Sequence, residues 1–208
     1  MIKVIIVDDH PVVRRGLMQI IEKEPDMEIA GEAKNADEFF SLLRKVNCTL
    51  VILDISLPDK NGFDVLKQLQ YELPKLPVLI LSIHSEDQYA VRFIKAGASG
   101  YLMKEAAPEE LIKAIRKVNA GGKYVSASLA EELVFHLDAS DKPAHKNLSD
   151  REFQILCLIA GGTSLKGIAY ELCISEKTVS TYRTRIFEKM KISTNADLIR
   201  YALDHHLV

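Results

Sequence analysis

The first 120 residues alternate short apolar runs with amphipathic stretches, and this alternation restricts the fold more than any other feature of the sequence. The apolar runs have the length and residue types of strands, and they lie at 3–9, 28–33, 49–55, 76–83 and 99–104. Helical periodicity predicts helices at 11–24, 36–45, 62–71, 85–96 and 108–119. Five strand–helix alternations of this length predict an α/β fold: a flavodoxin-like, doubly wound, five-stranded parallel sheet.

The pattern changes after residue 122, where no further strands are predicted. Ser128 and Glu131 have the spacing of a capping box, which opens a short predicted helix at Leu129–Leu137. The following polar stretch at 138–147 contains a proline and is typical of a linker. A second capping box, at Ser149 and Glu152, starts an all-helical tail. The expected parts are an α/β domain at 1–122, a short helix and linker at 123–147, and a small all-α domain at 148–208.

Composition and charge exclude several classes of protein. No apolar run approaches the roughly 18 residues that a membrane-spanning helix needs. The apolar N-terminal stretch is only about six residues long and ends in two aspartates, unlike a signal peptide, so we expect a cytoplasmic protein. The cysteines, Cys48, Cys157 and Cys173, are far apart, which argues against a disulfide framework or a zinc site.

Polar residues stand at the ends of four predicted strands. Asp8 and Asp9 follow the first strand, Asp54 comes at the end of the third, Ser82 at the end of the fourth and Lys104 at the end of the fifth. The carboxyl ends of parallel strands meet at one edge, so these side chains should converge. Three neighbouring carboxylates repel one another unless a cation lies among them, and an all-oxygen site suits Mg²⁺.

Each of these residues also has an ordinary structural explanation. Asp9 could cap the helix that begins near Pro11, Ser82 could be a satisfied strand-end hydroxyl, and Lys104 could be a solvated surface lysine. Their occurrence together at the ends of strands in one sheet favours a functional site over these separate explanations.

The C-terminal segment predicts a helix-turn-helix. Leu165–Leu172 forms the first helix, 173–175 the turn, and the second helix begins at Glu176 after Ser175, a good N-cap residue. Residues 176–191 carry five basic and two acidic residues. This excess permits nucleic-acid binding without proving it, because a solvated helix face has the same pattern. Apolar residues at core spacing are Ile168, Leu172, Ile174, Val179, Ile186 and Met190.

Segments from both halves, "VDDHPVVRRGL", "VILDISLPDKNGFDVL", "AGASGYLMKEA" and "IAYELCISEKTVSTYRTRIFEKM", carry a family resemblance. The chain resembles, over nearly its full length, a two-component response regulator of the NarL/FixJ class. Such proteins join a receiver domain to a LuxR-type helix-turn-helix domain.

The resemblance implies that Asp54 accepts a phosphoryl group from a phosphohistidine of a sensor histidine kinase. It implies that Asp9 and Asp54 hold Mg²⁺ together with the backbone carbonyl of Ser56 and waters. Asp8 would support the site either as a direct ligand of the metal or through a group that contacts the metal.

The resemblance also assigns the residues that read the phosphoryl group. Lys104 would pair with one phosphoryl oxygen and Ser82 would donate its hydroxyl to another. Tyr101 would move inward behind Ser82, and would so couple phosphate to the far surface of the domain.

In this family the second helix of the helix-turn-helix enters the major groove. Short hydroxyls on that helix can meet base edges, and its basic residues can reach phosphates. The last helix carries Leu198, Ile199, Ala202 and Leu203, which form either domain core or a dimer seam. The implied DNA-contacting residues are Lys177, Thr178, Ser180, Thr181, Arg183, Thr184, Arg185 and Lys189.

The function that the resemblance implies is phosphorylation-switched dimerisation and sequence-specific binding of promoter DNA, with RNA polymerase as a further partner and no membrane association. Such a protein is not a turnover enzyme. The alternative is a receiver-fold transcription factor that acts without phosphorylation. An aspartate-nucleophile phosphatase would need D-x-D at the first strand, where this chain has "DDH", and a flavin-binding protein would need a Ser/Thr/Gly-rich phosphate loop there.

Overall fold

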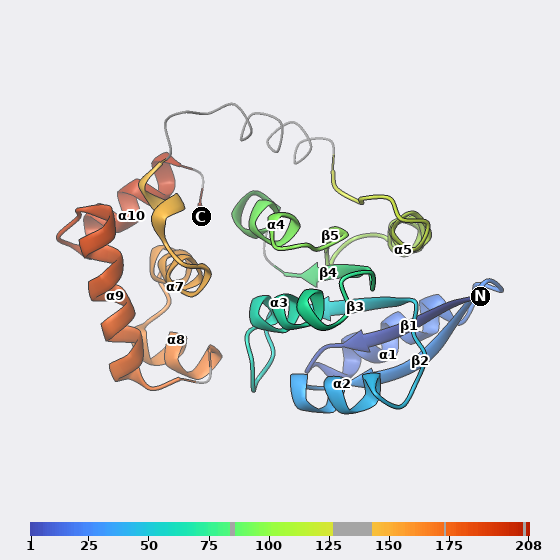
Figure 1. Cartoon of the computed structure of the whole chain (residues 1–208). Coiled ribbons are helices and arrows are strands. Elements are labelled where there is room, and N and C mark those ends of the chain that lie inside the picture. The colour runs from blue at the N-terminus through green and yellow to red at the C-terminus, as the bar shows by residue number, and fades with distance from the viewer. Residues whose placement is uncertain (84–85, 127–142, 173, 206) are drawn as a thin grey trace. The chain divides into compact units, whose positions relative to one another are not determined.

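The computed structural model describes residues 1–83, 86–126, 143–172, 174–205 and 207–208 (Figure 1). The chain divides into two compact units, Met1–Ala130 and Glu131–Val208. Among the described helices, none is long and apolar enough to cross a membrane. The short helix predicted at Leu129–Leu137 lies outside the described residues.

The first unit is built on five parallel strands in the order β2-β1-β3-β4-β5. This is the strand order of flavodoxin-like folds, and it confirms the predicted fold class. Every residue of β3 and β4 is buried, as expected for strands covered on both faces. The strands are β1 (Ile2–Val7), β2 (Met27–Ala33), β3 (Leu50–Asp54), β4 (Val78–Ser82) and β5 (Gly100–Met103).

Helices cover both faces of this sheet (Figure 1). Leu17 and Ile21 of α1 and Leu111 and Ile115 of α5 pack in one core cluster with residues from β1, β3, β4 and β5. On the other face, Phe63 of α3 packs against Phe93 of α4, with ring centroids 4.8 Å apart. The helices are α1 (Pro11–Ile21), α2 (Ala36–Leu43), α3 (Gly62–Glu72), α4 (Glu86–Lys95) and α5 (Pro108–Asn119).

Helix α1 ends at Ile21, three residues before its predicted end at Glu24. Glu24 is followed by Pro25, and a residue that precedes proline is disfavoured in helical conformation. The backbone N–H of Glu24 still reaches the carbonyl of Ile21, in a turn rather than a continued helix.

All secondary-structure elements among the described residues of the second unit are helices. The capping box of Ser149 and Glu152 at the start of α7 is present, with both reciprocal hydrogen bonds. The predicted helix-turn-helix is also present, and Ser175 caps its second helix by accepting from the N–H of Thr178. The elements are η1 (Ala144–Asn147), α7 (Asp150–Ala160), α8 (Leu165–Glu171), α9 (Glu176–Met190) and α10 (Asn195–Asp204).

The end of the predicted linker is structured, because residues 144–147 form a short 3-10 helix, η1. His145 joins η1 to α10: its backbone N–H donates to the Tyr201 hydroxyl at 3.3 Å, and its Nδ1 lies 3.0 Å from the same oxygen. Local composition gave no sign of η1, since the contact that fixes it comes from a residue far along the chain.

Helix α10 divides its apolar residues between core and surface. Leu198 and Ala202 are fully buried, whereas Ile199 and Leu203 keep 36% and 56% of their surface exposed. Leu198 and Ala202 therefore belong to the domain core, whereas burial alone does not assign a dimer seam to Ile199 and Leu203.

Candidate phosphoacceptor and DNA-binding sites

Two buried carboxylates lie at the carboxyl ends of neighbouring strands. Val7 and Leu53 are paired in the β1–β3 register, so Asp8 and Asp54 follow side by side. Only 1% of the surface of Asp8 and 3% of that of Asp54 is exposed. Burial of two neighbouring carboxylates is unfavourable unless a cation compensates their negative charge.

Lys104 supplies one compensating charge. Its Nζ lies 2.6 Å from Asp8 Oδ2 and 2.8 Å from Asp54 Oδ2, and its backbone N–H donates to the carbonyl of Ser82. Burial raises the pKa of Asp54 from 3.8 to about 6; Lys104 acts against this rise, and Asp8 adds to it. Burial by itself would lower the pKa of Lys104, but the two carboxylates hold it above its ordinary value. The solvated surface position considered for Lys104 is thereby excluded.

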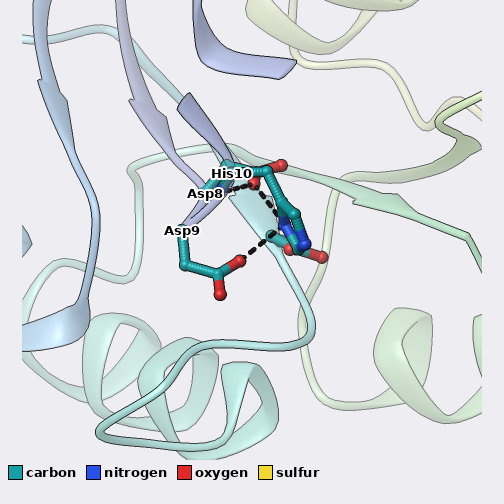
Figure 2. Close-up of side chains that lie close together, drawn as sticks. Asp8, Asp9 and His10 are labelled. Carbon is teal, nitrogen blue, oxygen red and sulfur yellow. Dashed lines mark hydrogen bonds and ion pairs between the residues drawn. The ribbon is translucent and has the colours of Figure 1, made fainter. Parts of the chain in front are cut away.

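Asp9 and the neighbouring His10 complete the cluster (Figure 2). His10 Nδ1 lies 2.7 Å from Asp9 Oδ1 and 3.2 Å from Asp8 Oδ1. One ligand atom from each of Asp8, Asp9, His10 and Asp54 falls within 4.8 Å of all the others. His10 was not predicted as a site residue; the signal that could have found it is its place directly after the two aspartates.

The donor set at this edge fits a hard divalent cation. Carboxylate oxygens predominate, as Mg²⁺ requires. Asp9 Oδ1 is shielded from solvent, and no donor among the described residues reaches it in hydrogen-bonding geometry, although His10 Nδ1 is near. Ser56 is half-buried beside the cluster, and its N–H donates to Asp54 Oδ1 at 3.3 Å. Asp8, Asp9 and Asp54 therefore offer the oxygen ligands that such an ion prefers.

Two further residues hold the loops of this site, and the sequence analysis missed both. The guanidinium of Arg14 donates to the carbonyl of Asp8 at 2.7 Å and pairs with Glu32 at 2.7 Å. Asp59, in the loop after Asp54, accepts from the backbone N–H groups of Ala36 and Asp37 at the start of α2, both at 3.0 Å. These contacts join separate elements of the fold, so local sequence patterns do not predict them.

Ser82 and Tyr101 are buried residues of the two strands β4 and β5. Ser82 ends β4 with 1% of its surface exposed. Tyr101, on β5, is fully buried, and its ring centroid lies 6.3 Å from that of Phe93 on α4. Tyr101 thus packs against α4.

Helix α9 presents a mixed basic and hydroxyl surface. Lys177, Thr181, Thr184, Arg185 and Lys189 are exposed, whereas Thr178, Ser180 and Arg183 are half-buried. The Thr181 and Thr184 hydroxyls donate to carbonyls one turn earlier in the helix, and the Thr178 hydroxyl lies 2.8 Å from that of Ser175. Of the predicted core, Ile168, Val179, Ile186 and Met190 are buried, and Leu172 and Ile174 are half-buried.

Lys189, at the end of α9, has a partner within the unit. Its Nζ lies 2.6 Å from Oε2 of Glu152, a carboxylate buried at the start of α7. Burial opposes ionisation of Glu152, but Lys189 and the backbone N–H of Ser149 hold its pKa below the ordinary value. The ion pair ties the last turn of α9 to the first turn of α7.

The model of the response regulator receiver domain family matches residues 4–116, more than half of the chain. The chain is a response regulator. The model of the luxR family of bacterial regulatory proteins matches residues 146–202, which include the helix-turn-helix. This response regulator therefore joins a receiver to a LuxR-type DNA-binding domain.

Individual relatives agree with this membership. The response regulator GacA of Pseudomonas aeruginosa is 36% identical over 211 residues, with 100% of this chain and 98% of the relative covered. The response regulator UvrY of Escherichia coli K12 is 32% identical, with 100% and 96% covered. The structure of RcsB from Salmonella enterica serovar Typhimurium bound to promoter rprA in the presence of phosphomimetic BeF3⁻ is similar, with 26% identity, a TM-score of 0.69, and 96% and 97% covered.

Proposed function

We propose that a sensor histidine kinase transfers a phosphoryl group to Asp54, and that this transfer switches dimerisation and promoter binding. The observation that carries the proposal is the buried Asp54 carboxylate, with Asp8 and Asp9 beside it and the Lys104 ammonium 2.8 Å away. A surface carboxylate would need no such surroundings. The receiver would occupy 1–122, the connecting segment 123–147 and the DNA-binding domain 148–208.

In the transfer, an Asp54 oxygen attacks phosphorus, an O–P bond forms, and the N–P bond to the donor histidine breaks. The histidine leaves as neutral imidazole after it takes up a proton. Bound Mg²⁺ would neutralise charge between the two anions that meet. Asp54 must be ionised to attack; burial raises its pKa to about 6 in the metal-free chain, and a bound cation beside the carboxylate would lower it.

The surrounding residues have distinct roles in this proposal. Asp8, Asp9, Asp54 and the Ser56 carbonyl would hold Mg²⁺. Lys104 exchanges its contact with the Asp54 carboxylate for one with a phosphoryl oxygen, and the Ser82 hydroxyl donates to another. Tyr101 transmits the change toward α4, whose Phe93 it already contacts.

We further propose that α9 enters the major groove of promoter DNA in the cytoplasm. Hydroxyls on its exposed face would lie against base edges, and its basic side chains would contact phosphates. The exposed Ile199 and Leu203 of α10 would form a seam between two copies, which fits binding to paired half-sites. RNA polymerase is a further partner. The contacting residues would be Lys177, Thr178, Ser180, Thr181, Arg183, Thr184, Arg185 and Lys189.

The test is the intact mass of the full chain after incubation with acetyl phosphate and Mg²⁺. We expect wild type and Asp64→Asn, an exposed carboxylate on α3, to gain one phosphoryl mass and Asp54→Asn to gain none. Gel-shift titrations on one promoter fragment then compare treated and untreated protein. A mass gain in Asp54→Asn would refute the assignment of the acceptor. Equal DNA affinity with and without the phosphoryl group would favour a regulator that acts independently of phosphorylation.

A further inference from the structure

His10 stands at the entrance to the carboxylate cluster and does not serve the helix that it precedes. It is the N-cap residue of α1, yet its side chain makes no capping hydrogen bond. Its side chain keeps 62% of its surface exposed, and its Nδ1 approaches two carboxylates, as Figure 2 shows. A structural role in α1 therefore does not explain the position of this ring.

The two separations between His10 Nδ1 and the carboxylate oxygens match those of neighbouring ligands around one ion. Bonds of about 2.0–2.1 Å to a six-coordinate ion place neighbouring ligand atoms about 3 Å apart. Nδ1 of His10 lies 2.7 Å from Asp9 Oδ1 and 3.2 Å from Asp8 Oδ1. Donors from Asp8, Asp9, His10 and Asp54 are all within 4.8 Å of one another.

Neither Lys104 nor Arg14 occupies the position between His10 Nδ1 and Asp9 Oδ1. Lys104 contacts Asp8 and Asp54 through their Oδ2 atoms, and Arg14 contacts the carbonyl of Asp8 and not its carboxylate. Asp9 Oδ1 receives no hydrogen bond in good geometry from the described residues. The cluster thus has a shielded carboxylate oxygen facing an imidazole nitrogen, with no second cation from the chain reaching that oxygen in the part that the structure describes.

We propose that His10 Nδ1 is a ligand of the receiver's metal ion, so that this site binds Mn²⁺ and other nitrogen-accepting divalent ions more tightly than Mg²⁺. First-row transition-metal ions accept imidazole nitrogen, Mn²⁺ the most weakly of the series, whereas Mg²⁺ prefers oxygen ligands and keeps water in place of the ring. The inference rests on the proposed metal site and adds a residue and a selectivity to it.

The test compares Mn²⁺ and Mg²⁺ binding to the full chain. Wild type is titrated with Mn²⁺ by electron paramagnetic resonance, Mg²⁺ affinity is measured by competition, and pulsed spectra of bound Mn²⁺ are searched for coupling to a ¹⁴N nucleus. His10→Phe keeps a ring and removes both nitrogens. His205→Phe, an exposed histidine on the second unit, is the matched control.

We expect ¹⁴N coupling in wild type and in His205→Phe, and its loss in His10→Phe. The Mn²⁺ affinity of His10→Phe should fall by about tenfold or more, since even outer-shell partners of ligands contribute about that much. Its Mg²⁺ affinity should change far less. Coupling that persists in His10→Phe, or Mn²⁺ and Mg²⁺ affinities that change in parallel, would overturn the inference while leaving the metal site intact. If Mg²⁺ displaces Mn²⁺ from none of the three proteins, the proposed Mg²⁺ site itself is refuted, and the inference is refuted with it.

Discussion

Asp54→Asn is expected to stabilise the metal-free receiver above pH 6. The pKa of Asp54 is about 6 in the folded chain, because burial opposes its charge, against 3.8 for an ordinary aspartate. A difference of about two pKa units corresponds to about 3 kcal/mol, the free energy by which ionised Asp54 weakens the fold. Asparagine has a similar shape and no charge, so it removes this cost.

The sign of the pH dependence follows from proton binding. Between pH 3.8 and about 6 the folded chain keeps a proton on Asp54 that the unfolded chain has lost. The contribution of Asp54 to stability is therefore present below pH 3.8, declines through this window and is lost above pH 6. The advantage of Asp54→Asn should be near zero at pH 4 and reach its full value by pH 7.

Calorimetry of the full chain in EDTA, at several pH values, measures this effect. The receiver transition is the one that Mg²⁺ shifts in wild type. A gain of about 3 kcal/mol corresponds to roughly 10 °C in Tm for a domain of this size. Asp54→Asn with an equal or lower Tm at pH 7 would show that ionised Asp54 does not weaken the fold. Mg²⁺ should narrow the difference, because it binds the ionised cluster of wild type more tightly.

Substitutions at three other residues have effects that can be measured. Lys104→Gln removes the cation between Asp8 and Asp54. The pKa of Asp54 should therefore rise by about 1 unit or more. The pH midpoint of labelling by acetyl phosphate, measured by intact mass, should rise with it. Asp59→Ala removes the acceptor of two N–H groups at the start of α2 and should lower receiver stability by about 1 kcal/mol in urea titrations; an unchanged midpoint would contradict this. Glu152→Gln breaks the ion pair of α7 and α9 but can still accept from the capped N–H, so the second unit should lose at most about 1 kcal/mol, and Glu152→Ala clearly more. Equal losses in the two variants would show that the cap contributes nothing.

Sequence reasoning was most successful where the signal is local. Strands β3 and β4 are short, apolar and buried on both faces, so hydrophobic runs alone identify them. The capping boxes depend on residues three positions apart, and the one at Ser149 and Glu152 lies as the spacing predicts. The helix predicted at 11–24 was too long. Its apolar periodicity continues to Glu24, but Glu24 precedes Pro25, and a residue before proline is disfavoured in helical conformation.

The sequence by itself determined the strand–helix alternation, the convergence of Asp8, Asp9, Asp54 and Lys104 at one edge, and the helix-turn-helix, since each depends on local periodicity and on the common direction of parallel strands. Only the tertiary structure decided which partners those side chains take.

The partners could not be predicted, because hydrogen bonds and ion pairs depend on distances between segments that the order of residues does not specify. Asp59 contacts α2 across 22 and 23 residues, and Lys104 reaches Asp54 across 50. His10 is adjacent to the metal-ligand candidates in sequence, but the direction of its ring toward them is set by the turn that the folded β1–α1 connection makes.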